Sequence, residues 1–386
     1  MVIYLLYLSL LGIIVLVFTL AKEKKFNIIS TILLTLIIIF FIFNPKGIMS
    51  SAVDGAILFF NSVFPTLFPF LVVTGILIQC GGVHIYSKIL GPFLCKPLRL
   101  PKESSLTLVV SILCGYPLGA KYSCDLYNEN HISLTQLQRL LNIASNVGPL
   151  FILGTICTAM LKIEGIAPYL LLISNYASCL IMSFLLPKAS TIGIHAPSYK
   201  SDKKNIGAIL KEALDQALAT SLSVGSFIVI FSVFNFVIGK LEIFNLLFSK
   251  VSTLFNIPLD AIRGVFFGLI EITNGCNILS TCNIGFPLKL SLISFLCSFS
   301  GLCIIFQVYS FTYKIKDISM KRYISRKFLQ GIISFILTYV LSSIVTLDVS
   351  TIAISKSYNF AFMIPLAVLM TLTFLAYKIK NLLHIS

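Results

Sequence analysis

Two apolar stretches of this 386-residue chain are each interrupted by a short polar break that contains glycine, and the same landmarks surround both breaks. The landmarks of the first half recur in the same order in the second half: Asp54 with Asp215, Pro101 with Pro258, Gly119 with Gly275, and Gly148 with Gly301. The offset falls slowly from 161 to 153 residues, as short loop deletions would produce. This order indicates a duplicated, discontinuous membrane unit. Glycine and proline interruptions at corresponding positions of two halves are typical of a transporter's binding site.

The composition excludes a soluble globule, because 57% of the residues are hydrophobic and only 11% are charged. Crossing the hydrocarbon core of a bilayer takes roughly 20 apolar residues. Seven segments approach that length: 1–20, 26–43, 64–81, 166–186, 221–238, 328–347 and 360–377. We therefore predict an all-α polytopic membrane protein, with the lipid bilayer as its immediate partner.

The net charge of +15 comes from lysines and arginines that gather in short loops between the predicted spans. These loops are 88–102, 200–204, 314–327 and 378–380. Such clustering is the positive-inside pattern of cytoplasmic loops, so no nucleic acid is expected as a partner. Segment 1–20 has no basic start and reads as an uncleaved first span that begins outside.

The stretch 102–114 predicts a half-helix of about 20 Å, which is too short to span a membrane. Pro101 suits the start of this helix, and Glu103 in its first turn complements the helix dipole. The chain is expected to turn at 115–119 and to return through the polar run 122–129. These segments form the first predicted re-entrant hairpin.

After this hairpin, Ser133 and Gln136 form a capping box that restarts a helix. That helix is predicted to break at 145–149. The second half repeats the pattern, with a half-helix opened by Pro258, a turn at 271–276 and a helix broken at 298–301. We predict a second re-entrant hairpin there.

Placing every basic loop in the cytoplasm starts the first unit outside and the second inside, so the repeats are expected to be inverted. About nine spans result, with a cytoplasmic C-terminus. Pro65 and Pro69 are expected to kink the span 64–81, whereas the second unit has Ser226 and Ile230 at the matching positions. The predicted division is 1–50 (two spans), 51–165 (first repeat), 166–204 (span and cytoplasmic loop), 205–313 (second, inverted repeat) and 314–386 (basic loop and two spans).

In lipid, irregular backbone is tolerated only where protein or a water-filled cavity covers it. The two hairpin tips are therefore expected to meet near the bilayer midplane and to line a cavity. Free amides and half-helix N-termini there would bind anions such as carboxylates. The candidate substrate-binding residues are Gly115, Tyr116, Pro117, Gly119, Lys121, Asn146, Gly148, Glu271, Thr273, Asn274 and Gly275.

Some of these residues have simpler explanations. Gly115 and Gly119 also suit close helix packing. Glu271 ends an apolar run, where it either couples transport to H⁺ or Na⁺ or forms a structural ion pair with Lys121 or Arg263. Lys121 equally suits a position that reaches the cytoplasmic surface.

Four segments together resemble the family of sporulation integral membrane proteins YlbJ, also called SpoVV. They are 61–70, 115–121, 146–151 and 268–275, and the resemblance extends from about residue 50 to 310. It implies nucleoside-recognition gate domains similar to those of concentrative nucleoside transporters. It also implies a bacterial membrane protein that moves dipicolinic acid across the outer forespore membrane, from the mother cell towards the developing spore.

Three functions follow as hypotheses. The first is a secondary carrier of a small organic anion, dipicolinic acid by resemblance. The second is a nucleoside or nucleobase carrier, and the third is a non-transporting membrane assembly factor in spore formation. An enzyme is not expected, because no nucleophile, base or metal-ligand pattern stands out among the ten cysteines and four histidines. No cofactor is expected, and the choice of coupling ion, H⁺ or Na⁺, stays open.

Overall fold

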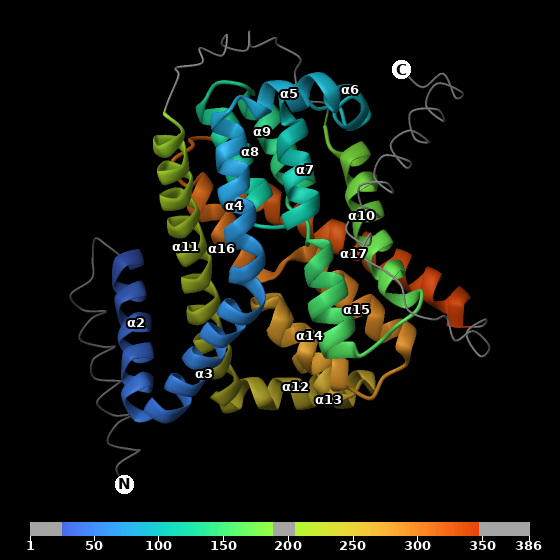
Figure 1. The fold of residues 1–386 in the computed structure, drawn as a ribbon. Helices are drawn as coiled ribbons and strands as arrows, with labels where there is room; N and C mark the ends of the chain where they lie inside the picture. The colour runs from blue at the N-terminus through green and yellow to red at the C-terminus, as the bar shows by residue number, and fades with distance from the viewer. Residues whose placement is uncertain (1–24, 188–204, 347–386) are drawn as a thin grey trace.

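The computed structural model describes residues 25–187 and 205–346, and every regular element within these ranges is a helix (Figure 1). The all-α prediction is confirmed for this part of the chain. The predicted spans 1–20 and 360–377 and the basic loops 200–204 and 378–380 lie outside the described residues.

Four of the described helices are long and apolar enough to cross a membrane: Ala167–Leu185, Ile206–Lys240, Phe286–Thr312 and Met320–Ile344. A fifth span results if the helices Ser30–Phe43 and Pro45–Asn61, which meet at 101°, are counted as one. The class of membrane protein therefore agrees with the prediction, but the described residues do not supply the expected total of about nine spans.

The chain enters through α2 (Lys25–Phe43), α3 (Pro45–Leu58), a π-helical turn (Phe59–Val63) and α4 (Phe64–Gln79). Pro65 lies in the first turn of α4, and Pro69 lies inside it. The corresponding helix of the second half, α11 (Ile206–Lys240), is continuous and packs along α3 and α4 (Figure 1). The difference follows from the two prolines, which remove backbone donors from the first helix, whereas α11 has none.

An aspartate near the membrane interface suits a helix cap, and this is one interpretation of the matching pair Asp54 and Asp215. Asp54 lies within α3 and Asp215 lies within α11, and both are exposed. The capping assignment is therefore wrong, although the two residues do occupy helices that pack together.

Each half then supplies one unit. The first contains α5 (Gly82–Ile89), α6 (Gly91–Leu94), a 3₁₀ turn (Lys102–Ser104), α7 (Ser105–Cys114), α8 (Leu118–Asn128), α9 (Leu134–Ile143) and a π-helix (Phe151–Leu161). The second contains α12 (Glu242–Phe255), α13 (Leu259–Ile270), α14 (Ile272–Thr281), α15 (Phe286–Phe299) and α16 (Gly301–Thr312). Helix α10 (Ala167–Leu185) follows the first unit, and α17 (Met320–Thr346) follows the second.

The two units begin at opposite ends of the molecule. Helices α5 and α6 lie along the top in Figure 1, whereas α12 lies along the bottom. Both surface segments, α5 with α6 and α12, expose apolar side chains. These are Ile85, Ile89 and Phe93 in the first segment, and Ile243, Leu246, Leu247, Leu254 and Phe255 in the second. An exposed apolar face on a short surface helix is typical of a helix at the membrane interface. The exposed apolar side chains of α5 and α6 therefore suit a position at the membrane interface.

Two of the basic loops meet at one end of the molecule. Arg139 in the middle of α9 is close enough to Arg99 and Arg326 to be repelled by both. Its guanidinium group donates hydrogen bonds to the Leu98 carbonyl at 2.7 and 3.0 Å and to carbonyls at the C-terminal end of α10, including that of Leu186 at 3.0 Å. The loops 88–102 and 314–327 therefore share one side, as the positive-inside pattern predicts.

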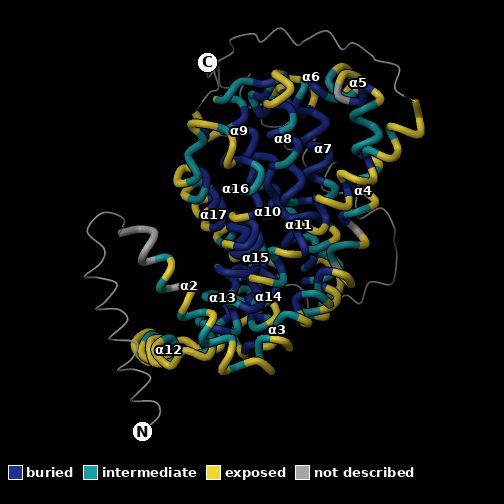
Figure 2. Tube along the Cα trace, turned by 90° about the vertical axis from the view of Figure 1, so that its left-hand side faces the viewer, coloured by how far each residue is buried: buried dark blue, intermediate teal, exposed yellow. Residues whose placement is uncertain are grey.

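A buried centre joins α10, α15 and α17 and supports both units (Figure 2). Ser298 Oγ donates to Asn175 Oδ1 at 2.7 Å, and Thr338 Oγ1 donates to Ser294 Oγ at 2.6 Å. Ser294 Oγ also lies 2.6 Å from Ser334 Oγ. Hydrogen bonds between helices hold such a bundle together where hydrophobic association is weak.

Candidate functional site

The first hairpin consists of α7 and α8, joined at Gly115, Tyr116 and Pro117. Helix α8 returns along α7 and reaches the 3₁₀ turn that precedes it. Gly115 has a φ of +79°, a conformation that side chains disfavour. A Cβ at Gly119 would lie 1.6 Å from the Ala144 carbonyl oxygen, so only glycine allows this approach.

The tip of this hairpin packs against the break between α9 and the π-helix. The Tyr116 amide donates to the Asn146 carbonyl at 2.6 Å. A Cβ at Gly115 would meet the backbone of Gly148 at 2.3 Å. The Tyr176 hydroxyl of α10 reaches carbonyls on both pieces, Ile112 at 3.0 Å and Val147 at 3.1 Å. The turn between α7 and α8 and the break that follows α9 therefore pack together through their backbones.

The arms of the second hairpin also pack closely, but they are joined at Glu271 alone. The predicted turn 271–276 is wrong in extent, because α14 already begins at Ile272. Gly275 of α14 faces Gly268 of α13, and an added Cβ would lie 2.1 Å from the Gly268 Cα. Gly264 faces Leu279 in the same way, so the two arms are antiparallel. The break between α15 and α16 lies on the tip: Gly301 has a φ of +73°, and its Cβ would come 3.0 Å from the Gly268 carbonyl oxygen.

The two assemblies meet in the middle of the protein. The α8 arm of the first hairpin packs on α16, and the α14 arm of the second packs on the π-helix. The Tyr116 hydroxyl lies within electrostatic range of Glu271, Cys276 and Cys297. Among the described residues this buried hydroxyl has no hydrogen-bond partner. Tyr116 and Glu271, one predicted site residue from each half, are therefore brought to one region.

Glu271 caps the start of α14. Its Oε1 accepts a hydrogen bond from the Thr273 amide at 3.0 Å, and its Oε2 accepts one from the Asn274 amide at 2.9 Å. The side chain is buried. A carboxylate on a helix N-terminus is stabilised by the free amides and by the helix dipole. The amides that were expected to bind a substrate carboxylate at this tip are therefore already occupied.

The ion pairs proposed for Glu271 are not formed. Lys121 Nζ lies 2.8 Å from Asp125 Oδ2 on the next turn of α8 and 4.7 Å from the centre of the Tyr122 ring. Arg263 donates to Asn245 Oδ1 at 3.0 Å and lies 3.9 Å from Asp260. Both cations are neutralised or bound locally, so the pairing with Glu271 was wrong.

A buried cation from α17 was missed by the sequence analysis, which placed Lys327 in a cytoplasmic loop. Lys327 Nζ donates to the Ser145 carbonyl at 2.5 Å and to Gln330 Oε1 at 2.9 Å. Gln330 in turn donates to Asn146 Oδ1 at 3.0 Å. The Tyr323 hydroxyl lies 2.7 Å from Ser145 Oγ. These three side chains of α17 surround the first break.

The spacing of these residues offered a signal. Tyr323, Lys327 and Gln330 are four and three residues apart, so they share one face of a helix. That polar face extends into the apolar run 328–347. This face can be recognised only when the helix is known to continue from the predicted loop 314–327 into the apolar run.

The residues described here contain no group of three or more histidine, cysteine or acidic side chains that would hold a metal ion. The chemistry of the site is therefore built from backbone amides and carbonyls, one buried carboxylate, one buried ammonium group and neutral polar side chains.

Comparison with known proteins gives the following findings. No family model matches the chain. The chain is 28% identical over 312 residues to the Bacillus subtilis (strain 168) protein named "Sporulation integral membrane protein YlbJ", covering 75% of this chain and 76% of that protein. The resemblance inferred from the four sequence segments is thereby confirmed.

Two solved structures of CNTnw, a concentrative nucleoside transporter, are also similar. One is in an inward-facing substrate-bound state, with a TM-score of 0.48 and 15% identity. The other is a double mutant in an outward-facing state, with a TM-score of 0.48 and 14% identity. Each match covers 74% of this chain and 76% of the CNTnw chain.

Proposed function

We propose that this chain, an integral membrane protein similar to the sporulation protein YlbJ, is a secondary transporter of a small organic anion. The observation that carries the proposal is the meeting of two hairpin tips and two helix breaks around the Tyr116 hydroxyl and Glu271. Irregular backbone at membrane depth is tolerated only where protein buries it or where it lines a water-filled cavity, and its occurrence at matching positions of two halves is typical of a transporter's binding site. Residues 51–165 and 205–313 are then two inverted gate repeats, within a total of about nine spans.

The balance of buried charge supports an anion as the substrate. Glu271 is satisfied by amides of its own helix. Lys327, which is fully buried, contacts only neutral oxygens and forms no ion pair among the described residues. A buried charge without a counter-ion is unfavourable, and a bound carboxylate supplies one. Dipicolinic acid, moved across the outer forespore membrane, is the substrate that the family resemblance implies.

Uptake by proteoliposomes tests the substrate. Purified protein is expected to take up labelled dipicolinate saturably, with competition by unlabelled dipicolinate and little competition by uridine. Protein-free liposomes are the control. Saturable uptake of uridine without dipicolinate uptake would transfer the assignment to a nucleoside carrier. Absence of uptake and binding for both compounds would favour an assembly factor.

One observation supports the nucleoside alternative. Two neutral amide side chains lie at the first break, Asn146 of the break itself and Gln330 of α17. The second hairpin supplies the carboxylate of Glu271. Amides and carboxylates are suitable hydrogen-bond partners for the hydroxyl groups and bases of nucleosides. Lys327 favours the anion over this alternative, because a neutral substrate leaves its charge unpaired.

Labelling of single cysteines tests the re-entrant arrangement. Asn130 follows α8 at the foot of the first hairpin, Asn283 follows α14 at the foot of the second, and both are exposed. In a cysteine-free background, Asn130→Cys is expected to react with an impermeant thiol reagent from the cytoplasmic side, and Asn283→Cys from the opposite side. Reaction of both from the same side would contradict inverted repeats.

A further inference from the structure

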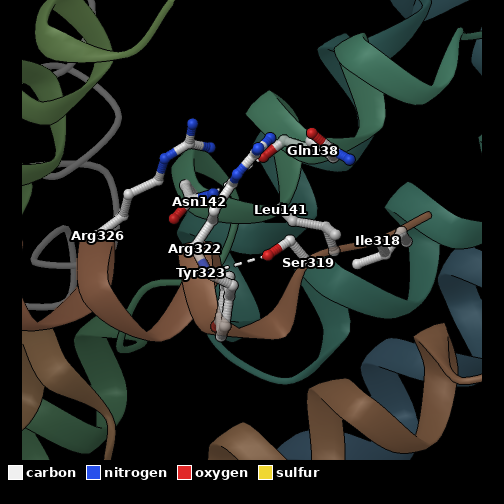
Figure 3. Close-up of a pocket in the computed structure, with 8 residues that line it drawn as sticks. All are labelled: Gln138, Leu141, Asn142, Ile318, Ser319, Arg322, Tyr323 and Arg326. Carbon is white, nitrogen blue, oxygen red and sulfur yellow. Dashed lines mark hydrogen bonds between the residues drawn. The ribbon is translucent and has the colours of Figure 1, made fainter.

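A pocket lies beside the start of α17, and one of its lining residues, Tyr323, contacts Ser145 at the first break (Figure 3). Its lining consists of Gln138, Leu141 and Asn142 of α9, Ile318 and Ser319 of the preceding loop, and Arg322, Tyr323 and Arg326 of α17. Arg322 and Arg326 project towards the same side, whereas Tyr323 points the opposite way. Of the three α17 residues, Tyr323 is the buried one, and its hydroxyl contacts Ser145 at 2.7 Å.

The mouth of this pocket is strongly positive. Arg322 repels Arg326, and Arg139 is repelled in turn by Arg326 and Arg99. Neither Arg322 nor Arg326 forms an ion pair with any described residue. Like charges gathered around one opening without a carboxylate raise the local concentration of anions and speed their association.

The floor of the pocket connects the mouth to the buried cation. Ser145 accepts from Lys327 through its carbonyl and contacts Tyr323 through its hydroxyl. Lys327 is one turn further along the same helix than Tyr323, and Arg326 is its immediate neighbour. Along α17, positive charge therefore continues from the exposed Arg322 and the half-buried Arg326 to the buried ammonium group of Lys327.

Resting on the proposed anion transport, we propose that this face of α17 is the cytoplasmic access path for carboxylates. Arg322 and Arg326 form an outer binding site for the carboxylate. Lys327 is the counter-ion of an inner binding site at the first break, and Tyr323 lies between the two sites.

Binding kinetics test this path. The full-length protein is placed in nanodiscs of phosphatidylcholine and mixed rapidly with dipicolinate. Lys327→Met is expected to weaken equilibrium binding roughly tenfold or more, the loss typical of a charged hydrogen bond. Lys327→Arg is expected to retain most of the affinity. The double variant Arg322→Gln and Arg326→Gln is expected to slow association and to remove its salt dependence, because exposed charges are screened above about 0.1 M salt.

Lys321→Gln is the matched control, because Lys321 is an exposed cation on the same helix outside the pocket. The arginine variants also keep the test valid if Lys327→Met fails to fold, since Arg322 is exposed and Arg326 is half-buried.

The outcomes separate the path from the transport proposal. If the wild type binds dipicolinate and all variants match it, the path is overturned and the transport proposal stands. If the wild type does not bind dipicolinate, both fall. If the arginine variants lose only a response to added phosphatidylglycerol, the pocket binds an anionic lipid headgroup, and the path is overturned.

Discussion

Glu271→Gln is expected to abolish transport while the protein remains folded and inserted. The glutamine keeps the shape of the side chain but offers one carbonyl oxygen in place of the two that accept from Thr273 and Asn274. It also removes the negative charge at the start of α14. Loss of a charged hydrogen bond destabilises the tip by roughly 1.5 to 3 kcal/mol, which is enough to move a hairpin that must hold one geometry at the site.

Two measurements check this expectation. Uptake into proteoliposomes gives the flux, and hydrogen exchange at Thr273 and Asn274 reports the tip. For Glu271→Gln we expect faster hydrogen exchange at these two amides and loss of dipicolinate uptake. Glu242→Gln is the control, because Glu242 lies in the first turn of α12 and is exposed. Wild-type flux in Glu271→Gln would assign the carboxylate a purely structural role.

Gly275→Ala is expected to prevent stable packing of the second hairpin. The added Cβ would lie 2.1 Å from the Gly268 Cα and 2.6 Å from the Gly264 carbonyl oxygen. Both are backbone atoms, so no side-chain rotation relieves the contact and α13 must separate from α14. Overpacking typically destabilises by about 1 to 3 kcal/mol, and a clash between backbones belongs at or above the upper end.

Thermal unfolding of the purified protein measures this effect. Gly285→Ala is the matched control, since a Cβ there meets no atom within 4 Å. Gly119→Ala is expected to behave like Gly275→Ala, because its Cβ would lie 1.6 Å from the Ala144 carbonyl oxygen. Equal stability of the Gly275 and Gly285 variants would show that the hairpin arms are not held this closely.

Local signals in the sequence identified most of the elements that form the site. Pro101 and Pro258 directly precede the two half-helices, and the Ser133 capping box is present with both of its hydrogen bonds. The breaks near Gly148 and Gly301 also lie where the repeat predicts them. These signals act within one or two turns of the chain, so the residues that carry them are visible without a partner.

The sequence by itself therefore determined the all-helical membrane class, the positions of the two turns between short helices and the positions of the two helix breaks. Only the tertiary structure decided which charges meet. Glu271 binds amides two and three residues away rather than Lys121, and Lys327 crosses 182 residues of sequence to reach Ser145. The reason is physical: a glycine turn or a proline start depends on the local backbone, whereas the counter-ion of a buried charge depends on which helices pack together.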